Sequence, residues 1–121
     1  MRKKHILIVD DEQEICFLLS ALLRQMGYDA EFAYSLKGGL DKLSGIDYYD
    51  IVFLDMNLPD GLGYKIIPEI KRSNQDTKVV MISAHDGMLR RMKQETHGID
   101  RYISKPFNRE HIYSVLAELD S

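Results

Sequence analysis

Apolar residues follow two alternating patterns along the chain: short continuous runs, and longer stretches in which they recur every three or four positions. Continuous runs fall at residues 6–9, 51–54 and 79–82, whereas residues 28–33 alternate loosely, as in a strand near the sheet edge, and residues 101–104 are expected to form a fifth short strand. Continuous runs rich in branched residues are typical of strands buried on both faces of a parallel sheet. The intervening stretches have the spacing of amphipathic helices. The pattern therefore predicts an α/β fold made of five strand–helix units.

The helical stretches have recognisable ends. The first is predicted to end at Gly27, a C-terminal cap, and its buried stripe is expected to comprise Ile15, Leu18, Leu19, Leu22, Leu23 and Met26. Further helices are expected at 35–43, 64–72, 87–97 and from Asn108 onward, the last with Ile112, Val115, Leu116 and Leu119 facing inward. Residues 57–63, which contain proline and glycine, are expected to form a long loop.

Length and composition set limits on this picture. With 121 residues, the chain is expected to form a single domain, 1–121, that folds without metal or disulfide staples. No apolar stretch approaches the ~20 residues needed to cross a bilayer, so no membrane span is expected. The net charge of −3 argues against direct nucleic-acid binding. Residues 1–5 are basic, but the short apolar run behind them does not suit a signal peptide, which predicts a cytoplasmic protein.

Cysteine and histidine offer little chemistry in this sequence. The single cysteine, Cys16, lies in a strongly helical stretch and is expected to be a small core residue rather than a reactive thiol. His5, His85, His97 and His111 are scattered, without the spacing of zinc ligands, and are expected to be surface or partly packed side chains.

Polar residues with useful chemistry stand at the carboxyl ends of several predicted strands. Asp10 and Asp11 follow the first run, Asp55 follows the third, and Ser83 follows the fourth. Lys105 follows the fifth run. Ligands of open parallel sheets bind beyond the carboxyl ends of the strands. Each residue alone could be a solvated turn residue or a helix cap, but together they predict one active site.

Three clustered carboxylates repel one another unless a cation offsets their charge. Oxygen ligands that leave room for water and phosphate favour Mg²⁺, with Mn²⁺ as a substitute. A magnesium ion beside a carboxylate, an ammonium and a hydroxyl suits phosphoryl transfer. We therefore expect Asp55 to be the nucleophile, with Lys105 and Ser83 binding oxygens of the phosphoryl group.

The motifs that contain these residues resemble the receiver domains of two-component response regulators, and the resemblance spans essentially the whole chain. The matching segments are Ile8-Val9-Asp10-Asp11-Glu12, Leu54-Asp55-Met56-Asn57-Leu58-Pro59-Asp60-Gly61, Ser83-Ala84 and Tyr102-Ile103-Ser104-Lys105-Pro106-Phe107. The resemblance implies a flavodoxin-like, doubly wound fold: a five-stranded parallel sheet of order 2-1-3-4-5 with five helices on its two faces. It also implies a cis peptide bond before Pro106.

The resemblance further implies a role for each matching residue. Asp55 would be the phosphoacceptor, modified from the phosphohistidine of a sensor histidine kinase or phosphotransfer protein. Asp11 and Asp55 would bind Mg²⁺ directly, Asp10 would act through a bound water, and Asn57 would add its backbone carbonyl.

Four residues would convert phosphorylation into a signal or set its lifetime. Ser83 and Tyr102 would switch a surface made by residues 87–97, the strand 101–104 and the last helix. Arg90 and Arg91, within residues 87–97, would belong to this surface. That surface could also support a homodimer. Asn57 and His85 would tune hydrolysis of the acyl phosphate. The chain is expected to be either a free-standing receiver or part of a longer regulator with an effector beyond Ser121, and the second is preferred because receivers of this family often stand at the N-terminus.

The sequence also permits comparison with two other classes. A haloacid-dehalogenase-like phosphohydrolase also uses a strand-end aspartate, a Ser or Thr, a lysine and Mg²⁺. Such enzymes carry a second aspartate two residues after the nucleophile as the general acid and base, and that position is Asn57 here. A flavin-binding module would not need three clustered acids. The signalling domain, which is not an enzyme acting on a separate substrate, is therefore the preferred interpretation.

Overall fold

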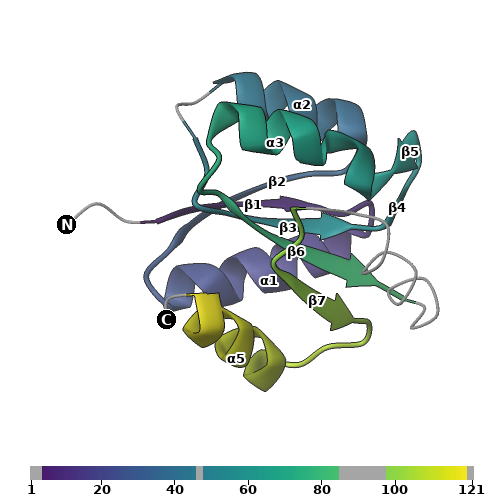
Figure 1. Cartoon of the computed structure of the whole chain (residues 1–121). Helices are drawn as coiled ribbons and strands as arrows, with labels where there is room; N and C mark the ends of the chain where they lie inside the picture. The colour runs from purple at the N-terminus through teal and green to yellow at the C-terminus, as the bar shows by residue number, and fades with distance from the viewer. Residues whose placement is uncertain (1–3, 46–47, 85–97, 120–121) are drawn as a thin grey trace.

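A computed structural model describes residues 4–45, 48–84 and 98–119. Its main sheet has five parallel strands: β1 (His5–Val9), β2 (Asp29–Ala33), β3 (Ile51–Asp55), β6 (Lys78–Ser83) and β7 (Arg101–Ser104). Their spatial order is β2-β1-β3-β6-β7 (Figure 1). Numbered along the chain, this is the expected order 2-1-3-4-5, so the fold prediction is confirmed.

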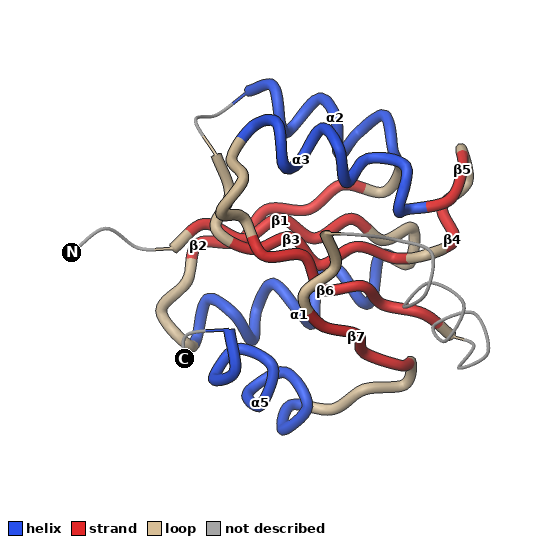
Figure 2. The backbone as a smooth tube through the Cα atoms, in the orientation of Figure 1, coloured by secondary structure: helices blue, strands red, loops and turns tan. Residues whose placement is uncertain are grey.

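Helices cover both faces of the sheet. The described helices are α1 (Gln13–Gln25), α2 (Leu36–Gly45), a 3-10 turn η1 (Gly63–Ile66), α3 (Ile67–Ser73) and α5 (Arg109–Leu119). Figure 2 shows α2 and α3 on one face and α1 and α5 on the other. The expected helix 87–97, with Arg90 and Arg91, lies outside the described residues, so the prediction of a fifth helix is untested there. None of the described helices is long and apolar enough to span a membrane.

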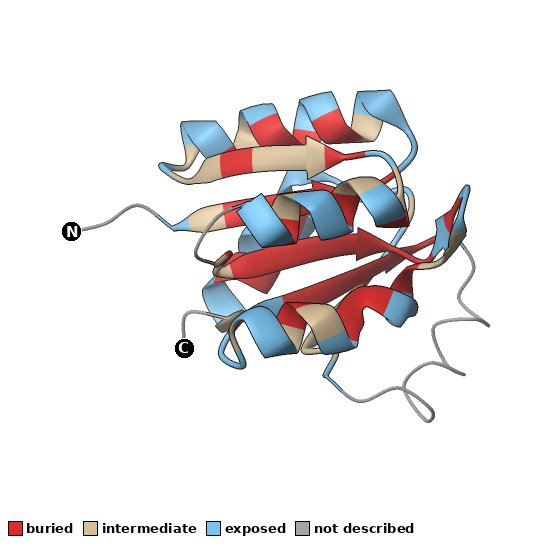
Figure 3. Cartoon of the chain, turned by 90° about the horizontal axis from the view of Figure 1, so that it is seen from above, coloured by how far each residue is buried: buried red, intermediate tan, exposed pale blue. Residues whose placement is uncertain are grey.

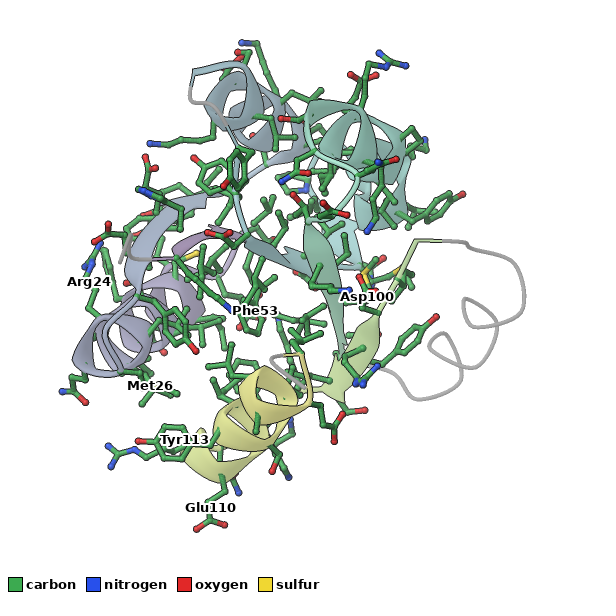
Figure 4. All side chains as sticks on the ribbon, turned by 60° about the vertical axis from the view of Figure 1, so that its left-hand side comes forward. Arg24, Met26, Phe53, Asp100, Glu110 and Tyr113 are labelled. Carbon is green, nitrogen blue, oxygen red and sulfur yellow. The ribbon has the colours of Figure 1, made fainter. Side chains whose placement is uncertain are left out.

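Two buried clusters, one on each face, hold these layers together. Alternation along β1 sends Leu7 and Val9 to the cluster under α2 and α3, and Ile6 and Ile8 to the cluster under α1 and α5. The central strand β3 is buried along its whole length (Figure 3). In Figure 4 its Phe53 lies in the interior, whereas α5 carries side chains outward. The site residues at the end of β3 therefore stand on a strand that is buried on both faces.

The buried face of α1 differs from the predicted stripe. Leu19 and Leu23 are buried as expected, but Leu18 is 71% exposed, and the inner face is completed by Cys16 and Ser20. Apolar residues are so dense in this helix that their spacing fits two adjacent faces, and only packing against the sheet selects one. The prediction for Leu18 was therefore wrong, whereas that for Cys16 as a core residue is confirmed.

Residues 57–63 are more ordered than the expected loop. They contain two short antiparallel strands, β4 (Asn57–Leu58) and β5 (Gly61–Leu62). In the turn between them, Asp60 reaches the N-terminus of α2, where its two carboxylate oxygens accept the N–H groups of Leu36 at 2.8 Å and Lys37 at 3.0 Å. Proline and glycine indicated a break in regular structure here, but they did not predict the short strand pair or the contact of Asp60 with α2.

Candidate functional site

The carboxyl ends of β1, β3 and β7 bring two aspartates and a lysine together. Asp10 is fully buried, Asp55 is 5% exposed, and the Lys105 side chain is 12% exposed. The Lys105 Nζ lies 3.0 Å from Asp10 Oδ2 and 3.6 Å from Asp55 Oδ2. These residues are separated by up to 95 positions in sequence, so the parallel topology assembles them as expected.

A third carboxylate, that of the exposed Asp11, completes an acidic cluster. Oxygen atoms of Asp10, Asp11 and Asp55 all lie within 4.8 Å of one another, close enough for one metal ion to contact all three. Asp10 Oδ2 is buried, and although the ammonium is nearby it accepts no well-aligned hydrogen bond from the described residues. A buried carboxylate oxygen in this condition is unusual, because buried polar atoms are nearly always satisfied. The donor set suits a hard divalent cation.

Burial and repulsion disturb the protonation of these groups. Burial, followed by the charge of Asp10, raises the pKa of Asp55 to about 7, although Lys105 opposes the shift. Burial also raises the pKa of Asp10. Burial lowers the pKa of Lys105, but the surrounding carboxylates outweigh this effect and the net pKa is raised. The site therefore carries more negative charge than one ammonium can balance.

The turn after β1 fixes Asp10 in place. Its Oδ1 accepts the backbone N–H of Glu12 at 2.9 Å, and its carbonyl oxygen accepts the thiol of Cys16 at 3.3 Å. Burial raises the pKa of Cys16 to about 12, so this thiol stays protonated and donates. The cysteine helps to position the acid and is not a nucleophile.

The segment after Asp55 is held equally closely. The Gly63 backbone passes so near that a Cβ there would lie 2.0 Å from the Asp55 carbonyl oxygen. The chain thus requires glycine at this position, which the sequence had suggested only as a general turn signal. The Met56 N–H donates to Ile82 O at 2.8 Å and ties the end of β3 to β6.

The remaining predicted residues lie around this centre. Ser83 is fully buried at the end of β6, beside β3, and its carbonyl oxygen accepts the Lys105 N–H at 2.7 Å. The Lys105-Pro106 peptide bond is cis, as expected. Tyr102 is half-buried against the cluster under α2 and α3, and burial raises its pKa. Asn57 is exposed at the start of β4. His85 lies outside the described residues.

One contact was not predicted. Glu12, the residue after the acidic pair, places its Oε1 3.5 Å from Lys105 Nζ. The position of Glu12 directly after Asp11 could have indicated a contact with the site. An acid at the start of a helix is, however, usually explained by its favourable interaction with the helix dipole, so no role in the site was predicted for Glu12.

An apolar groove lies between α1 and α5. Its lining residues are Ile15, Leu18, Leu19, Leu22, Phe107, Asn108, Arg109 and Ile112. Phe107 stands two residues beyond Lys105, so the groove begins close to the acidic cluster in sequence. The exposed side chain of Leu18 belongs to this groove.

Fold and site together define a class: doubly wound, flavodoxin-like α/β domains with an acidic, lysine-containing site beyond the carboxyl ends of the strands. The sequence matches the response regulator receiver domain over residues 6–117. The chain therefore belongs to the response regulator receiver domain family of two-component systems, and the resemblance found in the sequence is confirmed.

Individual relatives agree with this assignment. The chain is 36% identical over 107 residues to the response regulator ArlR of Staphylococcus saprophyticus, covering 88% of this chain and 48% of ArlR. It thus spans about half the length of that relative. A CheY-like receiver domain from Methanospirillum hungatei superposes with a TM-score of 0.88 at 28% identity, covering 98% of this chain and 95% of that one.

A second solved structure combines a receiver with further chain. Response regulator DrrB, described as a Thermotoga maritima OmpR/PhoB homolog, superposes with a TM-score of 0.80 at 28% identity. The match covers 97% of this chain and 52% of DrrB. The similarity therefore extends over about half of DrrB.

Proposed function

We propose that this receiver accepts a phosphoryl group on Asp55 from the phosphohistidine of a sensor histidine kinase or phosphotransfer protein, in a reaction that requires Mg²⁺. The observation that carries the proposal is the position of Asp55: it is nearly buried, it belongs to a cluster of three acids, and it lies 3.6 Å from Lys105. The negative charge of this site exceeds the positive charge of the one lysine, so the site suits a metal ion and, with it, a phosphoryl group.

The residues present fit a magnesium ion. Asp11 and Asp55 would bind it directly, Asp10 through a water, and Asn57 through its backbone carbonyl, with Mn²⁺ as a substitute. The under-satisfied Oδ2 of Asp10 supports this assignment. When bound, the cation would neutralise charge on the carboxylates and on the phosphoryl oxygens. The ordinary ligand preferences of Zn²⁺ are not met by this all-oxygen set.

The protein groups would share the work of the transfer. A carboxylate oxygen of Asp55 attacks phosphorus, the bond from phosphorus to the histidine nitrogen breaks, and the imidazole leaves with that electron pair and takes up a proton. Lys105 would stabilise a phosphoryl oxygen as a point charge, and the Ser83 hydroxyl would donate to another. Burial beneath the strand ends would limit access of bulk water to the acyl phosphate.

Signalling would follow from the added charge. Phosphorylation adds roughly −1.5 to −2 charges, which would draw Ser83 inward and let Tyr102 repack. The affected surface would comprise residues 87–97, β7 and α5, and it could mediate a homodimer. Asn57 and His85 would set the lifetime of the phosphoryl group.

The groove between α1 and α5 is a suitable surface for the phosphohistidine-bearing partner. It is apolar and close in sequence to Lys105, so a protein docked there could bring its histidine to the site. The proposal takes residues 1–121 as one cytoplasmic receiver that does not itself bind nucleic acid or membrane. An effector, where present, would supply the output.

The phosphohydrolase alternative is not supported. The family assignment is to receivers, and the residue two positions after Asp55 is Asn57, which cannot shuttle a proton. The domain is therefore proposed as a signalling element that assists its own phosphorylation and dephosphorylation.

Intact-mass measurement tests the central assignment. With acetyl phosphate and Mg²⁺, the protein should gain one phosphoryl group, EDTA should prevent the gain, and Asp55→Asn should abolish it. Asp50→Asn, at the opposite end of β3, is the matched control and should still be modified. A phosphoryl adduct that persists in Asp55→Asn would overturn the assignment.

A further inference from the structure

Lys105 has three carboxylates within 4.0 Å of its Nζ among the residues that the structure describes. Two of them, Asp10 and Asp55, also belong to the cluster that could hold a metal ion. The third, Glu12, does not belong to it. Its side chain is 59% exposed, at the rim of the site. The ammonium thus connects the candidate metal ligands to an acid outside them.

Glu12 occupies the N-cap position of α1, yet its side chain makes no capping hydrogen bond. Ser, Thr, Asp or Asn would be preferred there if capping were the main requirement. Instead its backbone N–H donates to Asp10 Oδ1, and its carboxylate approaches Lys105. Because the backbone contact is independent of the side chain, replacing the carboxylate with an amide should leave the turn intact.

The ammonium and a divalent cation would compete for the same two carboxylates, those of Asp10 and Asp55. Lys105 lies nearest to Oδ2 of Asp10 and Oδ2 of Asp55, which are also oxygens of candidate metal ligands. Two positive charges at one pair of carboxylates repel each other strongly in a buried site. For a metal to bind, Lys105 must therefore weaken its contacts with Asp10 and Asp55 without leaving the site.

We propose that Glu12 is a positioning residue that retains Lys105 at the rim of the site when a divalent cation takes over the aspartates. The inference rests on the proposed Mg²⁺ site. With its Oε1 3.5 Å from Nζ, Glu12 already provides a partner to which the ammonium can shift. Lys105 then stays near Asp55 and remains available to a phosphoryl oxygen. Without Glu12, the ammonium would hold the aspartates more strongly and oppose the metal.

A double-mutant cycle on Mg²⁺ affinity tests this inference. Affinity is measured by Mg²⁺ titration followed through amide NMR shifts, for Glu12→Gln in the native background and in the Lys105→Met background. In the native background the substitution should weaken Mg²⁺ binding about two- to fivefold, the range expected for one partly exposed ion pair. In the Lys105→Met background the loss should be smaller than twofold, because no ammonium remains to be displaced.

Glu14→Gln is the control for a general loss of negative charge, since Glu14 is also an exposed acid in the first turn of α1. It should change the affinity less than twofold. Equal losses for Glu12→Gln with and without Lys105, an equal loss in Glu14→Gln, or no loss in Glu12→Gln would each overturn the inference. If Lys105→Met does not fold, Lys105→Gln provides the same background without the charge.

The cycle also separates this inference from the proposed function. If the unmodified protein shows no Mg²⁺ binding at the aspartates, the proposed site fails and the role of Glu12 fails with it. If the protein binds Mg²⁺ and is phosphorylated on Asp55 but the cycle shows no coupling, only the role of Glu12 is refuted.

Discussion

The two ends of the parallel sheet use the same residue types in opposite ways. At the amino ends of the strands, Asp50 Oδ2 accepts the His5 N–H at 2.7 Å, and Asp100 Oδ2 accepts the Val79 N–H at 2.8 Å. Each of these acids satisfies the start of a neighbouring strand. At the carboxyl ends, three aspartates face one another and one lysine.

The lysines show the same contrast. At the amino ends, Lys71 Nζ donates to the Thr77 carbonyl oxygen at 2.5 Å and lies 3.6 Å from Asp100. It joins α3 to the sheet with one acid for one cation. At the carboxyl ends, Lys105 faces several acids. Balanced charges at one end thus stabilise the fold, whereas the imbalance at the other creates a site for a cation and a phosphoryl group.

The largest expected effect compares the two lysines. Lys105→Met should slow phosphorylation of Asp55 by acetyl phosphate about a hundredfold or more, since removing one preorganised charge-stabilising group typically costs this much. Lys71→Met should leave the rate within about twofold of the native value, because its charge lies at the opposite end of the sheet. Rates would be followed by intact-mass spectrometry at saturating Mg²⁺.

Circular dichroism would confirm that both lysine variants are folded before the rates are compared. Equal slowing in the two variants would break the contrast, because it would mean that Lys105 contributes only through overall charge or stability.

The second prediction neutralises one aspartate at each end. In EDTA at pH 8, Asp55→Asn should raise the free energy of unfolding by on the order of 2 kcal/mol, because it removes a buried, repelled carboxylate. Asp100→Asn should lower it by about 1 kcal/mol, because it weakens a charged hydrogen bond and the pair with Lys71. Urea denaturation measures both changes.

The pH dependence sharpens the prediction for Asp55. Since the pKa of this group is raised to about 7 in the folded protein, its ionisation destabilises the fold as pH rises from about 4 to 7. The gain from Asp55→Asn should therefore be complete above pH 7 and vanish as pH approaches 4. A gain that is equal at pH 5 and pH 8 would show that repulsion is not its cause.

The smallest expected effect concerns Asp60. This acid lies beyond the carboxyl ends of the strands, but it accepts backbone N–H groups as Asp50 and Asp100 do at the amino ends. Backbone N–H groups of Lys37 and Leu36 lower the pKa of Asp60, so its capping contribution is present above about pH 4 and is lost as pH falls through its folded pKa. Asp60→Ala should lower the urea midpoint slightly at pH 7 and hardly at all at pH 3. Asp76→Ala, at another exposed acid that accepts no backbone N–H of α2, is the control and should change the urea midpoint at pH 7 less than Asp60→Ala does.

Much of the architecture could be predicted from local patterns. Continuous apolar runs identified the three central strands, because a strand covered on both faces must be apolar on both. Loose alternation identified the edge strand β2, and its position between two helical stretches identified β7. A parallel sheet then places Asp10, Asp55 and Lys105 at the same end, so their proximity could be predicted before any distance was known. The predictions failed where the local signal was ambiguous, as for Leu18, or where a segment rich in turn residues formed short paired strands, as for residues 57–63.

The sequence by itself determined the order of strands and helices and the residue types at the carboxyl ends, because these depend on hydrophobic period and on position along the chain. Only the tertiary structure decided that Glu12 approaches Lys105, that Gly63 passes beside the Asp55 carbonyl, and that Asp60 caps α2. These contacts join segments through side-chain direction and backbone approach, which packing of the whole domain sets.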